Sequence, residues 1–133
     1  MTPAPALVLK DGQPVMALGG YGGDHIPQGT LQIFLNAVEF GLDPQEAVEE
    51  PRVYSYSFPN SSYPSTYLPG VMRAEGRIPP EVIEALRQRG HRVDRLPDWF
   101  EGACLDGMII RHPQTGVLQG GADPRGEVYA VGY

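Results

Sequence analysis

The sequence has very little cysteine: Cys104 is the only one among 133 residues. A single cysteine excludes a disulfide within the chain and leaves the redox compartment open. The thiol can be read as a nucleophile or as a small buried hydrophobic side chain, and the second role is the commoner one. The three histidines, His25, His91 and His112, stand far apart and lack the spacing of metal ligands. We therefore expect no metal and no cofactor.

Basic residues are also scarce. Lys and Arg number 10 against 16 Asp and Glu, which gives a net charge of −6 and a pI of about 4.9. No cluster of Lys and Arg is present, whereas binding to nucleic-acid phosphates needs a basic patch. No apolar stretch approaches the roughly 20 residues of a membrane-spanning helix, and the N-terminus lacks the pattern of a signal peptide. We expect neither nucleic acid nor a membrane as a partner.

Glycine and proline, in contrast, are abundant, with 17 and 14 residues. This composition indicates many turns and short elements. Hydrophobic residues make up 41% and charged residues 20% of the chain, which is enough apolar surface to bury a core. A length of 133 residues suits one domain. We therefore expect residues 1–133 to form a single domain.

Hydrophobic periodicity predicts hairpins interrupted by a few helices. Asp11-Gly12 lies between two apolar runs, 6–10 and 14–18, which we expect as the two strands of a hairpin. Apolar residues over about 27–40 recur at helical spacing, and Asp43 with Glu46 has the pattern of a capping box that begins a short helix. Further elements are expected as strands at 52–57, 71–75, 91–96, 105–111 and 117–120, a helix from 79 or 80 to 90, and a final strand or extended tail at 127–133. This order predicts an α+β fold, with a mainly antiparallel sheet and helices packed on it.

The stretch "ALGGYGGDHIPQ", residues 17–28, places four glycines between an expected strand and an expected helix. Glycine accepts positive φ and lets other groups approach the backbone N–H closely. A dinucleotide-binding loop fails because His25 stands where the last glycine of G-x-G-x-x-G is needed, and the Gly-Lys-Ser/Thr of a phosphate loop is absent. Two readings stay open: a tight turn, or an oxyanion hole in which Gly22 and Gly23 bind the oxygen of a tetrahedral acyl intermediate.

Three segments together resemble the γ-glutamyltransferases, or glutathione hydrolases. They are "MTPAPALVLKDGQPVMALGGYGGD", "LQIFLNAVEFGLDPQEAVEEPR" and "ADPRG" with a terminal "GY". The likeness runs over 1–133 and matches the C-terminal part of the family's small subunit. It implies part of the N-terminal-nucleophile hydrolase fold, in which two antiparallel sheets are stacked between helix layers. It also implies a precursor that cuts itself, after which a new N-terminal threonine attacks the γ-glutamyl amide with its own α-amine as base.

The resemblance assigns the oxyanion hole to the backbone N–H groups of Gly22 and Gly23. Tyr21 and Asp24 flank this pair and are candidate substrate-binding residues, although Asp24 also suits a helix cap. The family's threonine nucleophile lies upstream of the "MTP" segment, so Thr2 does not match it. The family's serine pair, acidic residue and arginine that hold the substrate lie upstream as well. The resemblance therefore implies that this chain is inactive alone.

The partner that the resemblance implies is an upstream segment or large-subunit chain of the same precursor; self-association is the other expectation. The substrate would be a small amide or γ-glutamyl compound. If Met1 is the true start we expect a cytoplasmic protein, whereas a longer precursor would allow a periplasmic or secreted one.

Two alternatives to a γ-glutamyl hydrolase stay open. The segment "GGDHIPQ" resembles a branch of the family that carries GGD-x-x-PQ and includes amidohydrolases and acylases with other substrates. A non-catalytic remnant that acts as a self-associating or binding module is the other alternative, because open sheet edges and apolar faces favour association.

Near the C-terminus, Asp123-Pro124-Arg125 predicts a structural turn with an Asp–Arg ion pair.

Overall fold

The computed structural model describes residues 3–102 and 104–132. The chain divides into two compact units, residues 1–50 with 101–133, and residues 51–100. The single domain expected over 1–133 stays a prediction. Among the described residues, no helix is long and apolar enough to cross a membrane.

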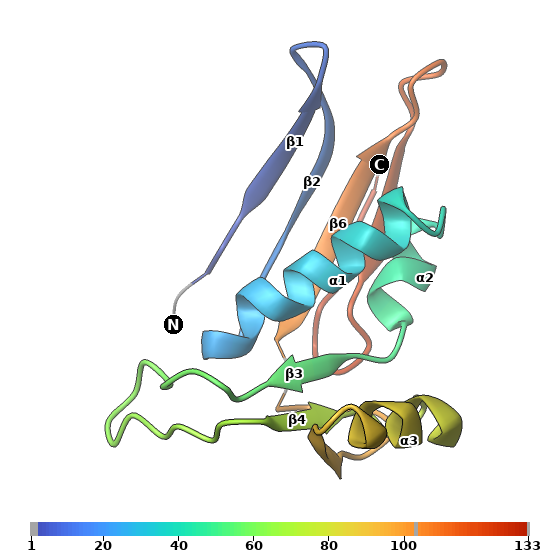
Figure 1. Ribbon diagram of the computed structural model, residues 1–133. Coiled ribbons are helices and arrows are strands. Elements are labelled where there is room, and N and C mark those ends of the chain that lie inside the picture. The colour runs from blue at the N-terminus through green and yellow to red at the C-terminus, as the bar shows by residue number, and fades with distance from the viewer. Residues whose placement is uncertain (1–2, 103, 133) are drawn as a thin grey trace. The chain divides into compact units, whose positions relative to one another are not determined.

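The first unit is a four-stranded antiparallel sheet with two helices on one face (Figure 1). The strand order is β1-β2-β6-β7, with bounds Ala6–Lys10, Gln13–Tyr21, Leu105–Arg111 and Leu118–Ala122. Both predicted hairpins, β1–β2 and β6–β7, are confirmed. Helices α1 (Ile26–Val38) and α2 (Pro44–Glu49) cover the sheet, and the core between the layers consists of Met16, Leu18, Ile33, Ala47, Val48 and Met108.

The capping box predicted for the short helix is present at the start of α2. The Asp43 carboxylate accepts a hydrogen bond from the backbone N–H of Glu46 at 2.9 Å, and Glu46 accepts one from the N–H of Asp43 at 3.1 Å. Both bonds satisfy N–H groups that have no acceptor within the helix. The sequence therefore sets the point at which α2 begins.

The second unit contains a three-stranded sheet in the order β3-β4-β5. Its strands are Val53–Ser55, Val71–Ala74 and Arg92–Arg95, and helix α3, Pro80–Gln88, connects the last two. Because that connection is a helical crossover, β4 and β5 run parallel, while β3 and β4 are antiparallel. The core of this unit is Ala74, Ile78, Ile83 and Val93.

Some details differ from the sequence-based expectations. Of the two forms expected for the C-terminal tail, the strand is not found in its described part, 127–132. Strand β2 is longer than expected and continues to Tyr21, because Gly19, Gly20 and Tyr21 pair with Gly107, Asp106 and Leu105 of β6. Two of the four glycines in this stretch, Gly19 and Gly20, therefore lie within a strand.

Candidate functional site

The glycine stretch contains two pairs of glycines that serve different purposes. Gly19 and Gly20 lie within β2, whereas Gly22 and Gly23 form the corner that follows it, with φ values of 141° and 73°. Residues with side chains rarely adopt such angles. We refer to Gly22 and Gly23 as the glycine corner.

The first pair allows close approach between backbone segments. A Cβ atom on Gly20 would overlap the Leu105 carbonyl oxygen and the Asp106 carboxylate, and a Cβ on Gly19 would lie 2.8 Å from the Ala4 carbonyl oxygen. Gly19 and Gly20 thus let β2 pair closely with neighbouring backbone as far as Tyr21. The glycine corner follows directly after this paired strand.

The glycine corner stands at the beginning of two consecutive helical segments. Gly22 is the N-cap of a short 3-10 helix, η1 (Gly23–His25), and α1 follows directly. The first N–H groups of a helix have no acceptor within it, and the helix dipole is positive at this end. Such N–H groups can bind an anionic oxygen. The glycine corner therefore lies at the end of the helical segments where an anionic group is favoured.

Tyr21 and Asp24, the two flanking candidates, lie in different surroundings. Tyr21 is the last residue of β2, is 38% exposed and lines a groove. Asp24 lies inside η1 and is not among the described residues that line this groove. The cap expected of Asp24 is wrong, because the backbone places Gly22 at the N-cap of η1 and His25 at that of α1. Thr2 lies outside the described residues.

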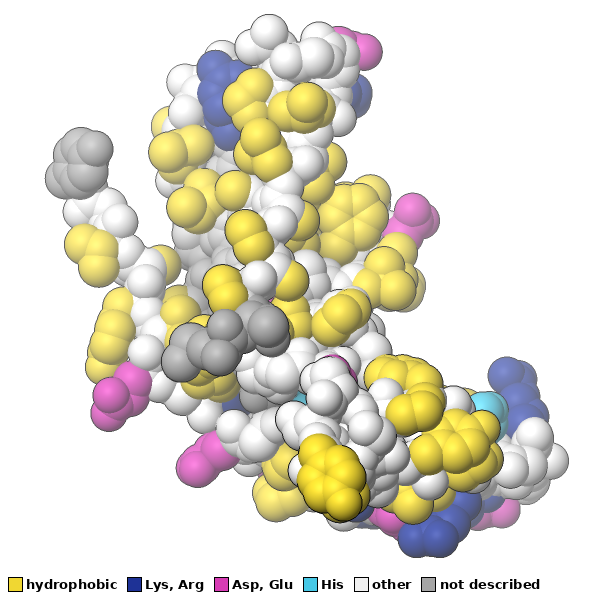
Figure 2. All heavy atoms as spheres, turned by 90° about the vertical axis from the view of Figure 1, so that its left-hand side faces the viewer, with side chains coloured by type: hydrophobic (Ala, Val, Ile, Leu, Met, Phe, Trp, Pro, Cys, Tyr) yellow, Lys and Arg dark blue, Asp and Glu magenta, His cyan; other side chains and the backbone are white. Residues whose placement is uncertain are grey.

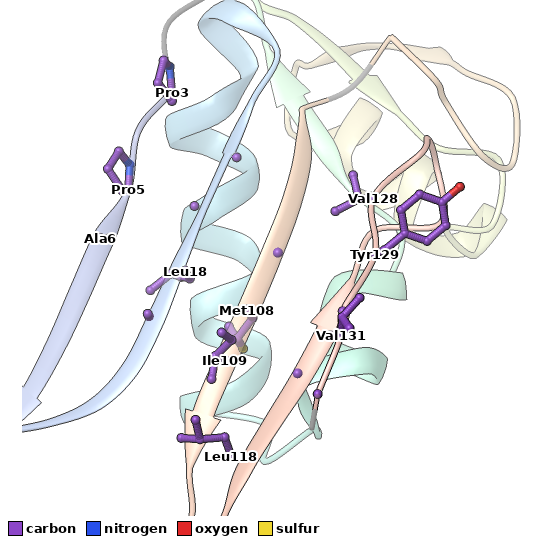
Figure 3. A pocket seen from close by; sticks show the side chains of 18 of the residues that line it. Pro3, Pro5, Ala6, Leu18, Met108, Ile109, Leu118, Val128, Tyr129 and Val131 are labelled. Atoms are coloured by element: carbon purple, nitrogen blue, oxygen red, sulfur yellow. The ribbon is translucent and has the colours of Figure 1, made fainter.

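The groove runs over the sheet face that α1 and α2 leave uncovered (Figure 3). It has a volume of about 1360 Å³, and its wall includes Pro5, Ile109, Leu118 and Val131. The lining also includes Gly19, Gly20 and Tyr21, the residues that precede the glycine corner in the chain. Figure 2 shows hydrophobic side chains at the surface on the side of the molecule that carries β1. The glycine corner therefore directly follows residues that line an open apolar groove.

A row of residues in register crosses this open face. Leu7 pairs with Ala17, and Ala17 pairs with Ile109. Because side chains alternate between the two faces of a strand, this row points away from the core residues Met16 and Met108. Leu7 is 63% exposed and Ile109 is 47% exposed. A sheet with one covered and one uncovered apolar face leaves a large surface for a further layer.

Sequence reasoning missed a buried carboxylate beside the glycine stretch, that of Asp106. It is fully buried and accepts hydrogen bonds from Thr30 Oγ1 and Cys104 Sγ, both at 2.9 Å. The signal was an acidic residue at a core-facing position of a largely apolar strand. Cys104 is buried as expected, but it also contacts this carboxylate.

The predicted Asp–Arg pair is confirmed. Arg125 Nη1 lies 3.0 Å from Asp123 Oδ1, and both side chains are fully buried. Within the described residues, no group of three His, Cys, Asp or Glu side chains could hold a metal ion.

Comparisons with known proteins agree with the fold and the sequence motifs. The family model described as gamma-glutamyltranspeptidase matches residues 1–133. The chain belongs to the gamma-glutamyltranspeptidase family. It has part of the N-terminal-nucleophile hydrolase fold, with a mainly antiparallel sheet and helices packed on it, as the resemblance implied.

Relatives within the family have different names. The chain is 35% identical to the glutathione hydrolase-like YwrD proenzyme of Bacillus subtilis, over 96% of this chain and 23% of that protein. It is 37% identical to the oxamate amidohydrolase proenzyme of Klebsiella pneumoniae, over 94% of this chain and 22% of that protein. A cephalosporin acylase from Bacillus halodurans has a TM-score of 0.79 and 32% identity, over 94% of this chain and 21% of that one. The chain thus spans less than a quarter of these relatives.

Proposed function

We propose that this chain is the C-terminal portion of a γ-glutamyltransferase-like hydrolase, and that Gly22 and Gly23 form its oxyanion hole. The observation that carries the proposal is the glycine corner itself. Both residues have positive φ, and both lie where helical N–H groups lack internal acceptors. In a family of hydrolases, N–H groups held in this way stabilise the negative oxygen that develops as an amide carbonyl is attacked.

The nucleophile of this reaction is an N-terminal threonine that lies outside these residues. We propose that the segment bearing it covers the open groove, because the groove is lined by Gly20 and Tyr21, which lead directly to the glycine corner. The relatives' names describe proenzymes, and this chain spans 23% and 22% of two of them. The rest of such a protein supplies the missing layer, so this chain is inactive alone.

The reaction we propose is hydrolysis or transfer of an acyl group from an amide through a threonyl ester. The threonine oxygen forms a bond to the carbonyl carbon, the amine leaves with a proton, and water or a second amine then takes the acyl group. A γ-glutamyl amide is the first candidate substrate. A small non-glutamyl amide is the second, favoured by the 37% identity to a protein named oxamate amidohydrolase.

The first experiment is intact mass spectrometry with N-terminal sequencing of the complete protein, purified from its natural source. We expect a companion chain or a longer precursor with a threonine that becomes N-terminal. A protein that consists of the 133-residue chain alone, as a monomer or self-associated, would refute the enzymatic proposal and favour a non-catalytic module. Turnover of a γ-glutamyl anilide, compared with that of oxamate, then distinguishes the two substrate classes.

The role of the glycine corner needs a change that removes an N–H without altering the backbone. Proline is unsuitable, because its φ is fixed near −65° and Gly23 has φ of 73°. Glycolic acid at position 23, introduced into the complete protein by semisynthesis, replaces the N–H by an ester oxygen. Loss of one oxyanion donor should lower kcat by roughly 100-fold or more.

The matched control is the same ester at Gly12, which also has positive φ, at 76°, but lies in the β1–β2 turn. We expect this control to retain kcat. An unchanged kcat in the Gly23 ester, with the fold intact by circular dichroism, would show that the glycine corner is not the oxyanion hole.

A further inference from the structure

We propose that Asp106 is a positioning residue for the glycine corner, acting from the β6 strand on both ends of the segment that contains it. This inference rests on the proposed oxyanion hole. The segment from Tyr21, the last residue of β2, to Gly29, in the first turn of α1, lies between Gly20 and Thr30. Asp106 contacts the residues on both sides of this segment.

On the helix side, the contact is a hydrogen bond. Thr30 Oγ1 donates to Asp106 Oδ1 at 2.9 Å, although the two residues are 76 positions apart in the sequence. Thr30 belongs to α1 and Asp106 to β6, so this bond ties the helix to the strand in the middle of the sheet. A hydrogen bond to a carboxylate is shorter and stronger than one between neutral groups.

On the strand side, the contact is steric. Gly20 pairs with Asp106 across β2 and β6. A Cβ atom at position 20 would overlap Asp106 Oδ1, the same oxygen that accepts from Thr30. The carboxylate therefore occupies the space that the missing side chain leaves, and from there it reaches α1.

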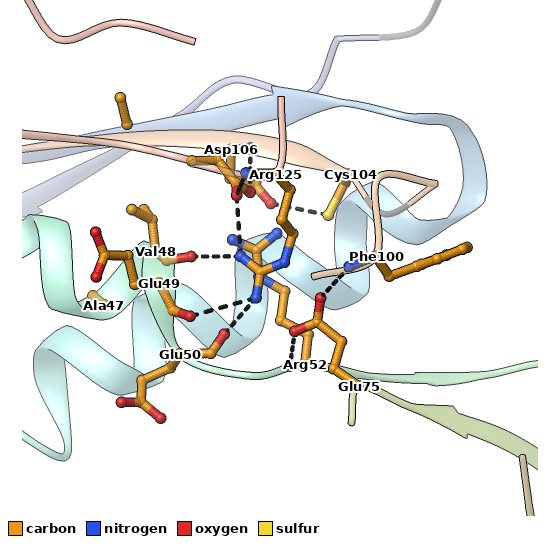
Figure 4. A network of polar contacts seen from close by, with 12 residues as sticks. Ala47, Val48, Glu49, Glu50, Arg52, Glu75, Phe100, Cys104, Asp106 and Arg125 are labelled. Atoms are coloured by element: carbon orange, nitrogen blue, oxygen red, sulfur yellow. Dashed lines mark hydrogen bonds and ion pairs between the residues drawn. The ribbon is translucent and has the colours of Figure 1, made fainter. Parts of the chain in front are cut away.

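Asp106 is itself held firmly, as a positioning residue must be. Its side chain is fully buried, and Oδ2 accepts from Cys104 Sγ at 2.9 Å. Its backbone N–H donates to Asp123 Oδ2 at 3.2 Å, and Asp123 is paired with the buried Arg125. The contacts around Asp106 and Arg125 in Figure 4 show how these groups converge.

The hydrogen bond to Thr30 and the close packing against Gly20 both restrain the direction in which the N–H groups of Gly22 and Gly23 point. Catalytic donors must be held within about 0.5 Å and 10–20° of their productive geometry by neighbouring groups. The oxyanion forms only as the reaction proceeds, so loosening its donors lowers kcat and leaves KM nearly unchanged. A residue that merely stabilises the fold would lower the unfolding temperature without this pattern.

The test uses Thr30→Val in the complete protein, with active sites counted by the burst of acyl-enzyme. We expect kcat per active site to fall by about tenfold, since small displacements of catalytic groups are costly, with KM changed less than about twofold. Thr30→Ser keeps the hydroxyl group that donates to Asp106 and should retain the parent kcat. Asn36→Ala is the control, because Asn36 Nδ2 ties the same helix to the Ala47 carbonyl oxygen of α2 at 3.0 Å. It should lower stability but not kcat.

A double-variant cycle shows whether Thr30 acts through the glycine corner. In the Gly23 ester, where one donor is already absent, Thr30→Val should cost much less in kcat than it does with the amide in place. Equal kcat in Thr30→Val and the parent, or an equal loss with and without the ester, would overturn the positioning role. If the ester alone has no effect on kcat, the proposed oxyanion hole fails instead.

Discussion

Arg125 and Asp123 form a buried ion pair that also closes the C-terminal end of α2. The Arg125 guanidinium donates to Asp123 Oδ1 at 3.0 Å and to the carbonyl oxygens of Val48 and Glu50, both at 2.8 Å. Figure 4 shows the guanidinium pointing at this helix end. The last carbonyl groups of a helix lack internal donors and carry partial negative charge. One side chain therefore fixes both the turn after β7 and the end of α2.

Replacement of Arg125 by methionine should destabilise the complete protein strongly. The change leaves the Asp123 carboxylate buried without its cation and removes the donors to the carbonyl oxygens of α2. Breaking a buried pair in this way costs about 3–5 kcal/mol. Urea denaturation of the complete protein measures it. Arg92→Met is the control, because the Arg92–Asp94 pair has side chains that are 72% and 41% exposed, and such pairs contribute about 0–1 kcal/mol.

Alanine at position 20 should cost stability because of crowding alone. Gly20 does not have positive φ, so the new methyl group causes no backbone strain but overlaps the Leu105 carbonyl and Asp106. Overpacking of this kind costs about 1–3 kcal/mol. Gly12→Ala is the opposite case: the added Cβ meets nothing within 4 Å, but the φ of 76° is strained for a residue with a side chain. This strain should cost about 1 kcal/mol. An equal free energy of unfolding in Gly20→Ala and the parent would show that β2 and β6 can move apart at this position without loss of stability.

The capping box gives a third prediction. Asp43→Ala removes the acceptor for the Glu46 N–H and should lower the free energy of unfolding by about 1 kcal/mol. Asp43→Asn keeps a side-chain oxygen at the N-cap and should stay within a few tenths of a kcal/mol of the parent. Thermal denaturation of the two variants side by side measures the difference. If both lose stability equally, the charge of Asp43 matters and the hydrogen bond does not.

Much of the fold was predictable because its signals are local. The Asp11-Gly12 hairpin, the helical periodicity of α1 and the Asp43 capping box each lie within a few residues. The glycine corner was predicted by resemblance, and its positive φ angles suit that role, which stays a proposal. The extent of β2 to Tyr21 was not predicted, because its partner strand, β6, is far away in the sequence. The Thr30–Asp106 bond was missed for the same reason.

The open groove gives a last prediction, which separates a covered face from a solvated one. Ile109, on the groove side of β6, and Val38, at the end of α1, are exposed to a similar degree, 47% and 50%. If a further layer covers the groove, Ile109→Lys buries an ammonium group without a partner, at a cost of several kcal/mol. Val38→Lys leaves its charge in water and should change little. Denaturation midpoints of the two variants of the complete protein measure the difference, and size-exclusion chromatography reports whether the companion segment stays bound. Equal midpoints would mean that this face of the sheet is open to water and that the nucleophile reaches the glycine corner from elsewhere.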